Sequence, residues 1–183
     1  MSDKSNVTAA KPKVGGAVYV APVGTTLPTD TSTALNEAFK SLGYISDAGA
    51  TNTNTPNVTT IRAWGGDEVL DISTEKSDQW QFNLIEVTNI EVLKLIYGSS
   101  NVSGTLDTGI TINATNNELE EHAVVIDMIL KGGTAKRVVL PAASVISVGT
   151  ITYSDSAAVG YDTTLNCHPD ANSRSHYEYI KAV

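Results

Sequence analysis

A strand followed directly by a short helix is the clearest pattern of apolar and polar positions in the chain. Between residues 79 and 84 the two kinds of side chain alternate, in the order Gln79, Trp80, Gln81, Phe82, Asn83, Leu84. This two-residue period is that of a strand with one buried and one solvated face. The period then becomes helical, since apolar residues recur on one face at Ile90, Leu93, Ile96 and Tyr97.

The residues around this helix predict where it begins and ends. Thr88 and Glu91 have the T-x-x-E spacing of a capping box, in which both side chains bind backbone N–H groups that a helix start leaves unpaired. Gly98 is the residue type that ends helices. Because a helix of about two to three turns is marginal in water, we expect it to pack on the sheet that contains the preceding strand.

Short β-branched runs between turn residues predict several more strands. The clearest hairpin joins residues 122–130 to residues 135–140 through a turn at Gly132 and Gly133, and Pro141 is expected to end its second arm. Asp127 lies among apolar residues of the first arm, so its face of that strand is not expected to be a sealed apolar core. Further strands are predicted over residues 15–21, 44–46, 59–64, 68–74, 110–113, 144–153 and 159–168.

A second helix and a long loop are predicted in the first third of the chain. Residues 30–33 have side chains typical of a helix start, and Leu35, Phe39 and Leu42 then lie near one face. Residues 47–60 are mostly Asn, Thr, Gly and Pro and have little to bury, which is typical of a functional loop. We expect this loop to contact a partner.

These elements predict a mainly β protein: an antiparallel β-sandwich or open barrel with one flanking α-helix, a second short helix and extended terminal arms. One domain is expected over residues 15–168, including the long loop at 47–60. Residues 1–14 are polar and aperiodic, which indicates a flexible N-terminal arm. Residues 169–183 form a C-terminal arm, whose apolar residues Tyr177, Tyr179, Ile180 and Val183 are expected to dock on a neighbouring subunit.

Composition narrows the classes of protein to which the chain can belong. Its 183 residues carry a formal net charge of −8 at pH 7, which argues against gripping nucleic acid through phosphate neutralisation. No apolar run is long enough to span a membrane, and the first residues contain no apolar signal-peptide core, so folding in a cytoplasm is expected. The single Cys167 excludes an internal disulfide and is expected to be reduced, buried and inert.

The sequence contains no convincing catalytic or metal-binding pattern. His122, His168 and His176 are scattered and are interpreted as surface residues, because a functional histidine needs an orienting partner. Cys167 and His168 are neighbours on a strand and point to opposite faces, so they cannot act as a thiolate–imidazolium pair. Turns explain the acidic pairs and the Gly-rich stretches. We therefore predict no enzyme activity, no cofactor and no metal.

Several segments, taken together in their order, resemble a known family. They are GAVYVAPVGTTLP, ALNEAFKSLGYISDAG, IRAWGGDEV and WQFNLIEVTNIEVLKLIYG, followed by a late β-hairpin, and they span residues 15–167. In this order they resemble the major tail tube proteins of long, non-contractile-tailed bacteriophages. The resemblance implies the tail-tube fold, a β-sandwich flanked by a helix.

The resemblance also implies an assembly and its partners. Members of this family form hexameric rings whose sheets join into one inner β-barrel, and the rings stack around a tape measure protein into a tube that conducts DNA. Tail tip and tail terminator proteins are further partners, and the protein is expected in the virion tail after assembly in the host bacterial cytoplasm. Both arms and residues 47–60 would carry ring-to-ring contacts. DNA would pass without specific binding, and no membrane would be involved.

The pattern of the strands agrees with such a conduit, because a sheet that lines an aqueous lumen needs one apolar and one polar face. A negative wall would repel phosphate groups and let DNA slide. Glu86, Asp127 and Asp162 are the candidate lumen-facing acids, because they lie on strands opposite apolar neighbours.

Two other functions stay open at this point. One is a monomeric carbohydrate-binding or adhesin β-sandwich, in which Trp64, Trp80 and the tyrosines would form a sugar-stacking platform, although Trp80 lies on the apolar side of its strand. The other is a hydrolase, which would need the three histidines to meet an acid in one pocket.

Overall fold

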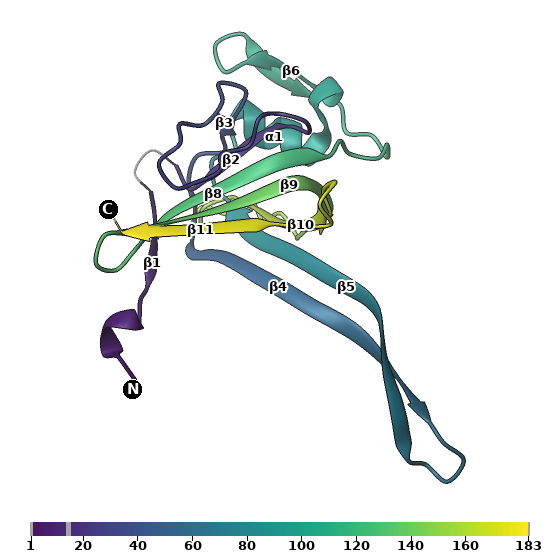
Figure 1. Ribbon diagram of the computed structural model, residues 1–183. Helices are drawn as coiled ribbons and strands as arrows, with labels where there is room; N and C mark the ends of the chain where they lie inside the picture. The colour runs from purple at the N-terminus through teal and green to yellow at the C-terminus, as the bar shows by residue number, and fades with distance from the viewer. Residues whose placement is uncertain (1, 14–15, 183) are drawn as a thin grey trace.

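The chain forms a mainly β structure with antiparallel strands and one α-helix, as predicted, and its architecture agrees with a β-sandwich (Figure 1). The computed structural model describes residues 2–13 and 16–182, without the side chains of residues 74 and 75. The predicted arms include Met1, Val14 and Val183, and a predicted strand begins at Gly15; these four lie outside the described residues. Within the described part of the chain, no helix is long and apolar enough to cross a membrane.

In the described part of the chain, nine strands form one sheet, and one hairpin, one α-helix and two short 3-10 helices lie outside it. The sheet contains β1 (Ala10–Pro12), β2 (Val18–Pro22), β3 (Lys40–Ser41), β4 (Ile45–Arg62), β5 (Glu68–Leu84), β8 (His122–Leu130), β9 (Thr134–Val148), β10 (Tyr161–His168) and β11 (Tyr177–Ala182). Its order is β3-β2-β8-β9-β10-β5-β4, with β1 paired to β8 and β11 paired to β9. The other elements are β6 (Val102–Thr105), β7 (Gly109–Ile112), α1 (Ile90–Tyr97), η1 (Lys4–Asn6) and η2 (Ser99–Asn101).

Strand β9 joins the two halves of the sheet. One edge of β9 pairs with β8, and the other edge pairs first with β11 through residues 134–139 and then with β10 through residues 142–148. The register with β8 shifts around Pro141, which therefore lies at a bulge. The prediction that Pro141 ends the strand is wrong, because a bulge tolerates the missing backbone N–H and β9 continues to Val148.

The main core lies between the apolar faces of the sheet and α1. Residues of β10 alternate regularly between buried and half-buried, and β5 buries the three apolar residues of the predicted alternation, Trp80, Phe82 and Leu84. Helix α1 contributes Val92, Leu93, Leu95 and Ile96 to the same cluster. Both predicted strands and the packing of the helix on the sheet are confirmed.

The start of α1 differs from the predicted capping box. Asn89 is the N-cap, and its Oδ1 accepts a hydrogen bond from the Glu91 N–H at 3.0 Å. The Glu91 carboxylate instead accepts from Lys94 Nζ at 2.9 Å, so Thr88 and Glu91 do not form the predicted pair. Gly98 ends the helix with φ of 93°, as predicted.

A smaller apolar cluster lies on the other face of β2, β8 and β9, and the irregular segment between β2 and β3 covers it. The second short helix predicted in this segment does not form. Asp30 Oδ1 accepts from the Ser32 and Thr33 N–H groups, as at a helix start. However, Arg137 Nη1 donates to the carbonyls of Asp30 at 3.0 Å and Thr33 at 2.7 Å. A helix would need these two carbonyls for N–H groups four residues later, so the chain stays irregular.

The polar loop predicted at residues 47–60 is also wrong, because this segment belongs to β4. β4 has 18 residues and pairs with the 17 residues of β5 in one long hairpin, which closes through a turn at Gly65 and Gly66. At about 3.3 Å per residue, β4 is about 60 Å long. The hairpin therefore projects far beyond the body of the molecule (Figure 1). Residues 51–62 of β4 are exposed on both faces, so no burial pattern marks this part of the chain as a strand.

Both terminal arms pair with the sheet of their own chain. Lys11 of β1 lies opposite Ile129 of β8, and β11 runs antiparallel to the first part of β9. Tyr177 and Tyr179 pack against the smaller apolar cluster, whereas Ile180 is exposed. Two of the apolar residues expected to dock on a neighbour are therefore used within the chain.

Candidate functional site

The described residues contain no group of three or more histidine, cysteine, aspartate and glutamate side chains that could hold a metal ion. The three histidines have different neighbours. His168 Nε2 lies 2.8 Å from Ser144 Oγ and 3.8 Å from Oε1 of Glu121, the residue before His122, whereas His176 Nδ1 contacts Asp78. Burial lowers the pKa of His122. The hydroxyl and the carboxylate approach the same nitrogen of His168, which differs from a catalytic triad, where the acid binds the other ring nitrogen.

Cys167 and Trp80 are core residues, as predicted. Burial raises the pKa of the Cys167 thiol to about 12, so the thiol is protonated and unreactive at neutral pH. Trp80 is 5% exposed, whereas Trp64 is fully exposed near the end of the long hairpin. These two indole rings therefore do not form a common sugar-stacking platform.

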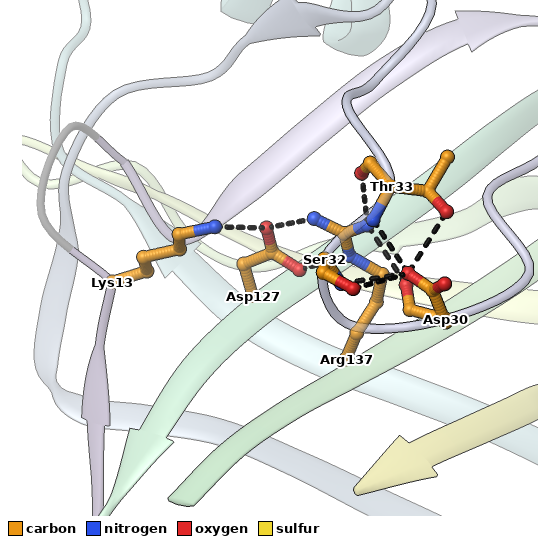
Figure 2. A network of polar contacts seen from close by, with 6 residues as sticks. All are labelled: Lys13, Asp30, Ser32, Thr33, Asp127 and Arg137. Carbon is orange, nitrogen blue, oxygen red and sulfur yellow. Dashed lines mark hydrogen bonds and ion pairs between the residues drawn. The ribbon is translucent and has the colours of Figure 1, made fainter. Parts of the chain in front are cut away.

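A buried ion pair fastens the segment between β2 and β3 to the sheet (Figure 2). Asp127 and Arg137 lie opposite each other on β8 and β9 and are 4% and 3% exposed. Arg137 Nε donates to Asp127 Oδ1 at 2.6 Å, and Nη2 donates to Oδ2 at 2.7 Å. The remaining nitrogen, Nη1, donates to the carbonyls of Asp30 and Thr33. Lys13 Nζ approaches Asp127 Oδ2 at 3.6 Å from its more exposed side.

This network gives both buried charges the partners that they require. Asp127 is occupied by Arg137 inside the subunit and presents no free charge to solvent, so it does not qualify as a lumen-facing acid. The sequence analysis missed Arg137. The hairpin turn at Gly132 and Gly133 was a usable signal, because closing the hairpin there places Arg137 directly opposite Asp127.

Asp30 organises the loop side of this network. Hydrogen bonds lower the pKa of its carboxyl to about 2, with the Thr33 backbone N–H contributing most and the Thr33 hydroxyl and Ser32 adding to it. The carboxylate therefore remains ionised above about pH 3. It holds the turn in which the Asp30 and Thr33 carbonyls point toward Arg137 (Figure 2).

Glu86 connects the start of β4 to the start of α1. Its Oε1 accepts from the Tyr44 N–H at 2.9 Å, and its Oε2 accepts from Asn89 Nδ2 at 3.2 Å. Gly43 has φ of 74°, and a Cβ at this position would lie 1.9 Å from Glu86 Cδ. The Glu86 carboxylate therefore fits here only because residue 43 is a glycine.

Two rows of polar side chains cross four strands on the face of the sheet that is turned away from the main core. Directly opposed residues of antiparallel strands point to the same face, and the register defines the rows. They are Ser147, Thr164, Gln81 and Thr51, followed by Ser144, Asn166, Gln79 and Thr53. Asp162 precedes these rows on β10, and Gln81 Nε2 donates to its two carboxylate oxygens at 3.0 and 3.1 Å. We call Asp162 and the two rows the polar sheet face.

The outer part of the long hairpin has only two strands. β5 pairs with β10 through residues 79–84 only, so residues 54–62 and 68–78 extend beyond the rest of the sheet (Figure 1). We call these residues the distal ribbon. An isolated pair of strands is marginally stable at best in water, which indicates that the distal ribbon gains stability from a further contact.

One face of the distal ribbon carries three large apolar side chains, and we call it the apolar face. Ile61 lies opposite Leu70, with Ile72 next on the same face, and these three side chains are 42–54% exposed. The opposite face is mixed, because Thr60 Oγ1 donates to Asp71 at 2.7 Å there and Val58 and Val69 are also exposed on it. The apolar face is therefore an unpaired surface at the far end of the molecule.

A buried carboxylate ties the root of the distal ribbon to the C-terminal arm. Asp78 is 2% exposed, accepts from Asn52 Nδ2 at 2.8 Å, and contacts Ser175 Oγ and His176 Nδ1. Burial alone would raise the pKa of Asp78, but the hydrogen bonds outweigh it and lower the pKa. The His176 ring also meets the Trp80 ring edge-on, with centroids 6.0 Å apart. The sequence contained no signal for this contact, because its members are far apart along the chain.

Comparison with known protein families places the chain in a family of described function. Residues 1–182 match the family model described as phage tail tube protein. Among curated proteins, no match was found. The matched range includes the polar sheet face, the distal ribbon and both arms.

Proposed function

The chain belongs to the phage tail tube protein family, and we propose that it builds the tube of a long, non-contractile tail from stacked hexameric rings. Members of this family are structural proteins that self-associate into a tube in the virion tail. The observation that supports this proposal most directly is the distal ribbon. It is a two-stranded extension with an exposed apolar face, and such a structure needs a partner for stability.

The distal ribbon is the proposed contact between stacked rings. Its apolar face, formed by Ile61, Leu70 and Ile72, would be covered by a subunit of the adjacent ring. Burying this face would gain roughly 25 cal/mol for each Å² of apolar surface removed from water. The terminal arms are proposed to add to these contacts.

The polar sheet face is the proposed wall of the lumen. Its uncharged side chains would be hydrated, and Asp162 would give the wall a negative charge that repels phosphate groups. Glu86, just beyond the end of β5, is the second proposed acid. DNA would then pass through the tube during ejection without being bound.

Other tail components complete the proposed assembly. A tape measure protein would fill the lumen before DNA enters, and tail tip and tail terminator proteins would close the two ends of the tube. Assembly would take place in the cytoplasm of the host bacterium.

Electron microscopy and light scattering of the purified protein test tube formation. We expect hollow tubes of constant diameter, or rings, to appear as the protein concentration rises. Adding preformed tail tips should nucleate tubes from a monomeric preparation. A protein that stays near 19.3 kDa under all these conditions would contradict the proposal.

A labelling experiment tests the lumen separately. Thr164→Cys places a thiol on the polar sheet face, and the native Cys167 does not interfere because it is buried and protonated. A maleimide attached to a bulky polymer should label Thr164→Cys in free subunits and fail to label it in tubes. Equal labelling in both forms would remove this face from the lumen while leaving tube formation intact.

A further inference from the structure

We propose that a lysine-rich end of the subunit binds the acidic segment 118–121 of a second copy, so that neighbouring subunits join head to tail through opposite charges. The inference rests on the self-association proposed above and adds the chemistry of one contact between copies.

The lysine-rich end consists of Lys11, Lys131 and Lys181. Lys11 lies opposite Ile129, Ile129 lies opposite Ala135, and Ala135 lies opposite Lys181. These four residues form one row across β1, β8, β9 and β11, so Lys11 and Lys181 are on the same face, about 14 Å apart at the usual strand spacing. Lys131 follows the end of β8, where its backbone N–H donates to the Ala9 carbonyl at 2.8 Å.

These three lysines carry charges that the described part of the chain does not neutralise. All three are exposed, and among the described residues none of them forms an ion pair with a carboxylate. Neighbouring Lys13 and Lys136 differ in this respect, because they pair with Asp127 and Glu178. Lys11 and Lys131 also border a groove whose floor includes Ile129 and Leu130. In a protein with a net charge of −8, this is a local basic surface.

The acidic segment is at the opposite end of the same strand. Glu118, Glu120 and Glu121 are exposed and precede β8, and the sequence contains no Lys or Arg between Lys94 and Lys131. Glu120 accepts from Ser99 Oγ at 2.9 Å. Among the described residues, Glu118 and Glu121 form no ion pair with a lysine or arginine, and Glu121 Oε1 lies 3.8 Å from Nε2 of the His168 ring.

The two surfaces cannot meet within one subunit. β8 has nine residues, which at about 3.3 Å per residue puts about 30 Å between Glu121 and Lys131. The end of β11 and β1 also lie on the opposite side of the body from the β6–β7 hairpin, which leads into the acidic segment (Figure 1). A second copy supplies the missing charge for each surface. Because the two surfaces differ, the contact is head to tail, the type that closes rings or extends filaments.

Charge reversal at each end tests the contact. The first variant carries Lys11→Glu and Lys131→Glu and changes the net charge from −8 to −12. The second carries Glu118→Lys and Glu121→Lys, changes the net charge from −8 to −4 and keeps the Glu120–Ser99 hydrogen bond. Either variant alone brings like charges together at every contact, so we expect assembly to need at least about tenfold more protein than wild type.

An equal mixture of the two variants provides the decisive result. One variant is acidic at both ends and the other is basic at both ends, so they complement each other when they alternate. We expect the mixture to assemble within about threefold of the wild-type concentration. Sedimentation velocity and negative-stain microscopy measure the critical concentration. Wild-type assembly should also weaken as NaCl is raised from about 50 to about 500 mM, because exposed charges are screened.

A matched variant controls for net charge. Thr26→Asp, Thr152→Asp, Ser154→Asp and Ser156→Asp together also change the net charge from −8 to −12, at exposed positions outside both surfaces. We expect it to assemble like wild type, and circular dichroism should show native folds for all variants. Two results would overturn the proposed contact and leave the proposal of tube formation intact. One is that the charge-reversed variants assemble like wild type. The other is that their mixture fails to assemble although both variants are folded. Wild-type protein that never assembles, even with tail tips, would overturn both proposals.

Discussion

Removing Arg137 should destabilise the subunit strongly, because Arg137→Met leaves Asp127 buried without its main partner. The arginine makes two hydrogen bonds to the carboxylate and two to backbone carbonyls. Removing one partner of a buried pair costs about 3–5 kcal/mol. For a chain of this size, 1 kcal/mol corresponds to about 2–4 °C in Tm, so Tm should fall by about 6–20 °C. Lys13 offsets little of this loss, since it is 3.6 Å away and half-exposed.

Urea unfolding followed by tryptophan fluorescence measures the loss, because Trp80 is buried and reports on the core. Lys136→Met is the matched control. It removes the neighbouring and more exposed ion pair with Glu178, so it should cost no more than about 1 kcal/mol.

A double variant then separates the ion pair from other effects of the substitution. Arg137→Met with Asp127→Leu should recover at least about 2 kcal/mol of the loss, since it removes the unpaired buried charge. An Arg137→Met variant within about 1 kcal/mol of wild type would refute the reasoning. A double variant no more stable than the single one would refute it as well.

Three further predictions concern other parts of the molecule. Leu93→Asp should abolish the circular dichroism spectrum of the folded protein, because it buries an unpaired charge in the main core. A soluble Leu93→Asp variant that still assembles would contradict the packing of α1. Asp78→Asn should lower the free energy of unfolding at pH 7. Because the folded pKa of Asp78 is lowered, its contribution is present above the unfolded pKa of about 3.9 and disappears as pH falls through the folded value. The wild-type and variant urea midpoints should therefore converge below about pH 4. A difference between the two midpoints that does not change with pH would exclude the ionisation of Asp78 as its cause. A triple variant with Ile61→Thr, Leu70→Thr and Ile72→Thr should keep the free energy of unfolding in urea within about 1 kcal/mol of wild type, since these side chains are exposed. The same variant should form no tubes in electron micrographs. Normal tubes would exclude the distal ribbon as a stacking contact.

Local patterns in the sequence were sufficient for the elements that bury one face. The alternation around Trp80 and Phe82 and the helical spacing around Leu93 correctly predict α1 and the inner part of β5, residues 79–84, because burial of one face leaves a period in the sequence itself. The turn at Gly132 and Gly133 similarly predicts the β8–β9 hairpin. The sequence by itself therefore determined the fold class through these local patterns, and it determined the family resemblance through the order of its motifs.

The tertiary structure alone decided the elements whose hydrogen bonds depend on distant residues. The segment after Asp30 has helix-start chemistry, but Arg137, more than 100 residues later, takes the carbonyls that a helix needs. Residues 47–60 become a strand only because β5 supplies hydrogen-bond partners for a segment that buries little of its own surface. The partners of Asp78 were likewise brought together by folding, because Asn52 and His176 are far from it along the chain. A period can be read along one segment, whereas a hydrogen bond between distant segments exists only after the chain has brought both of them together.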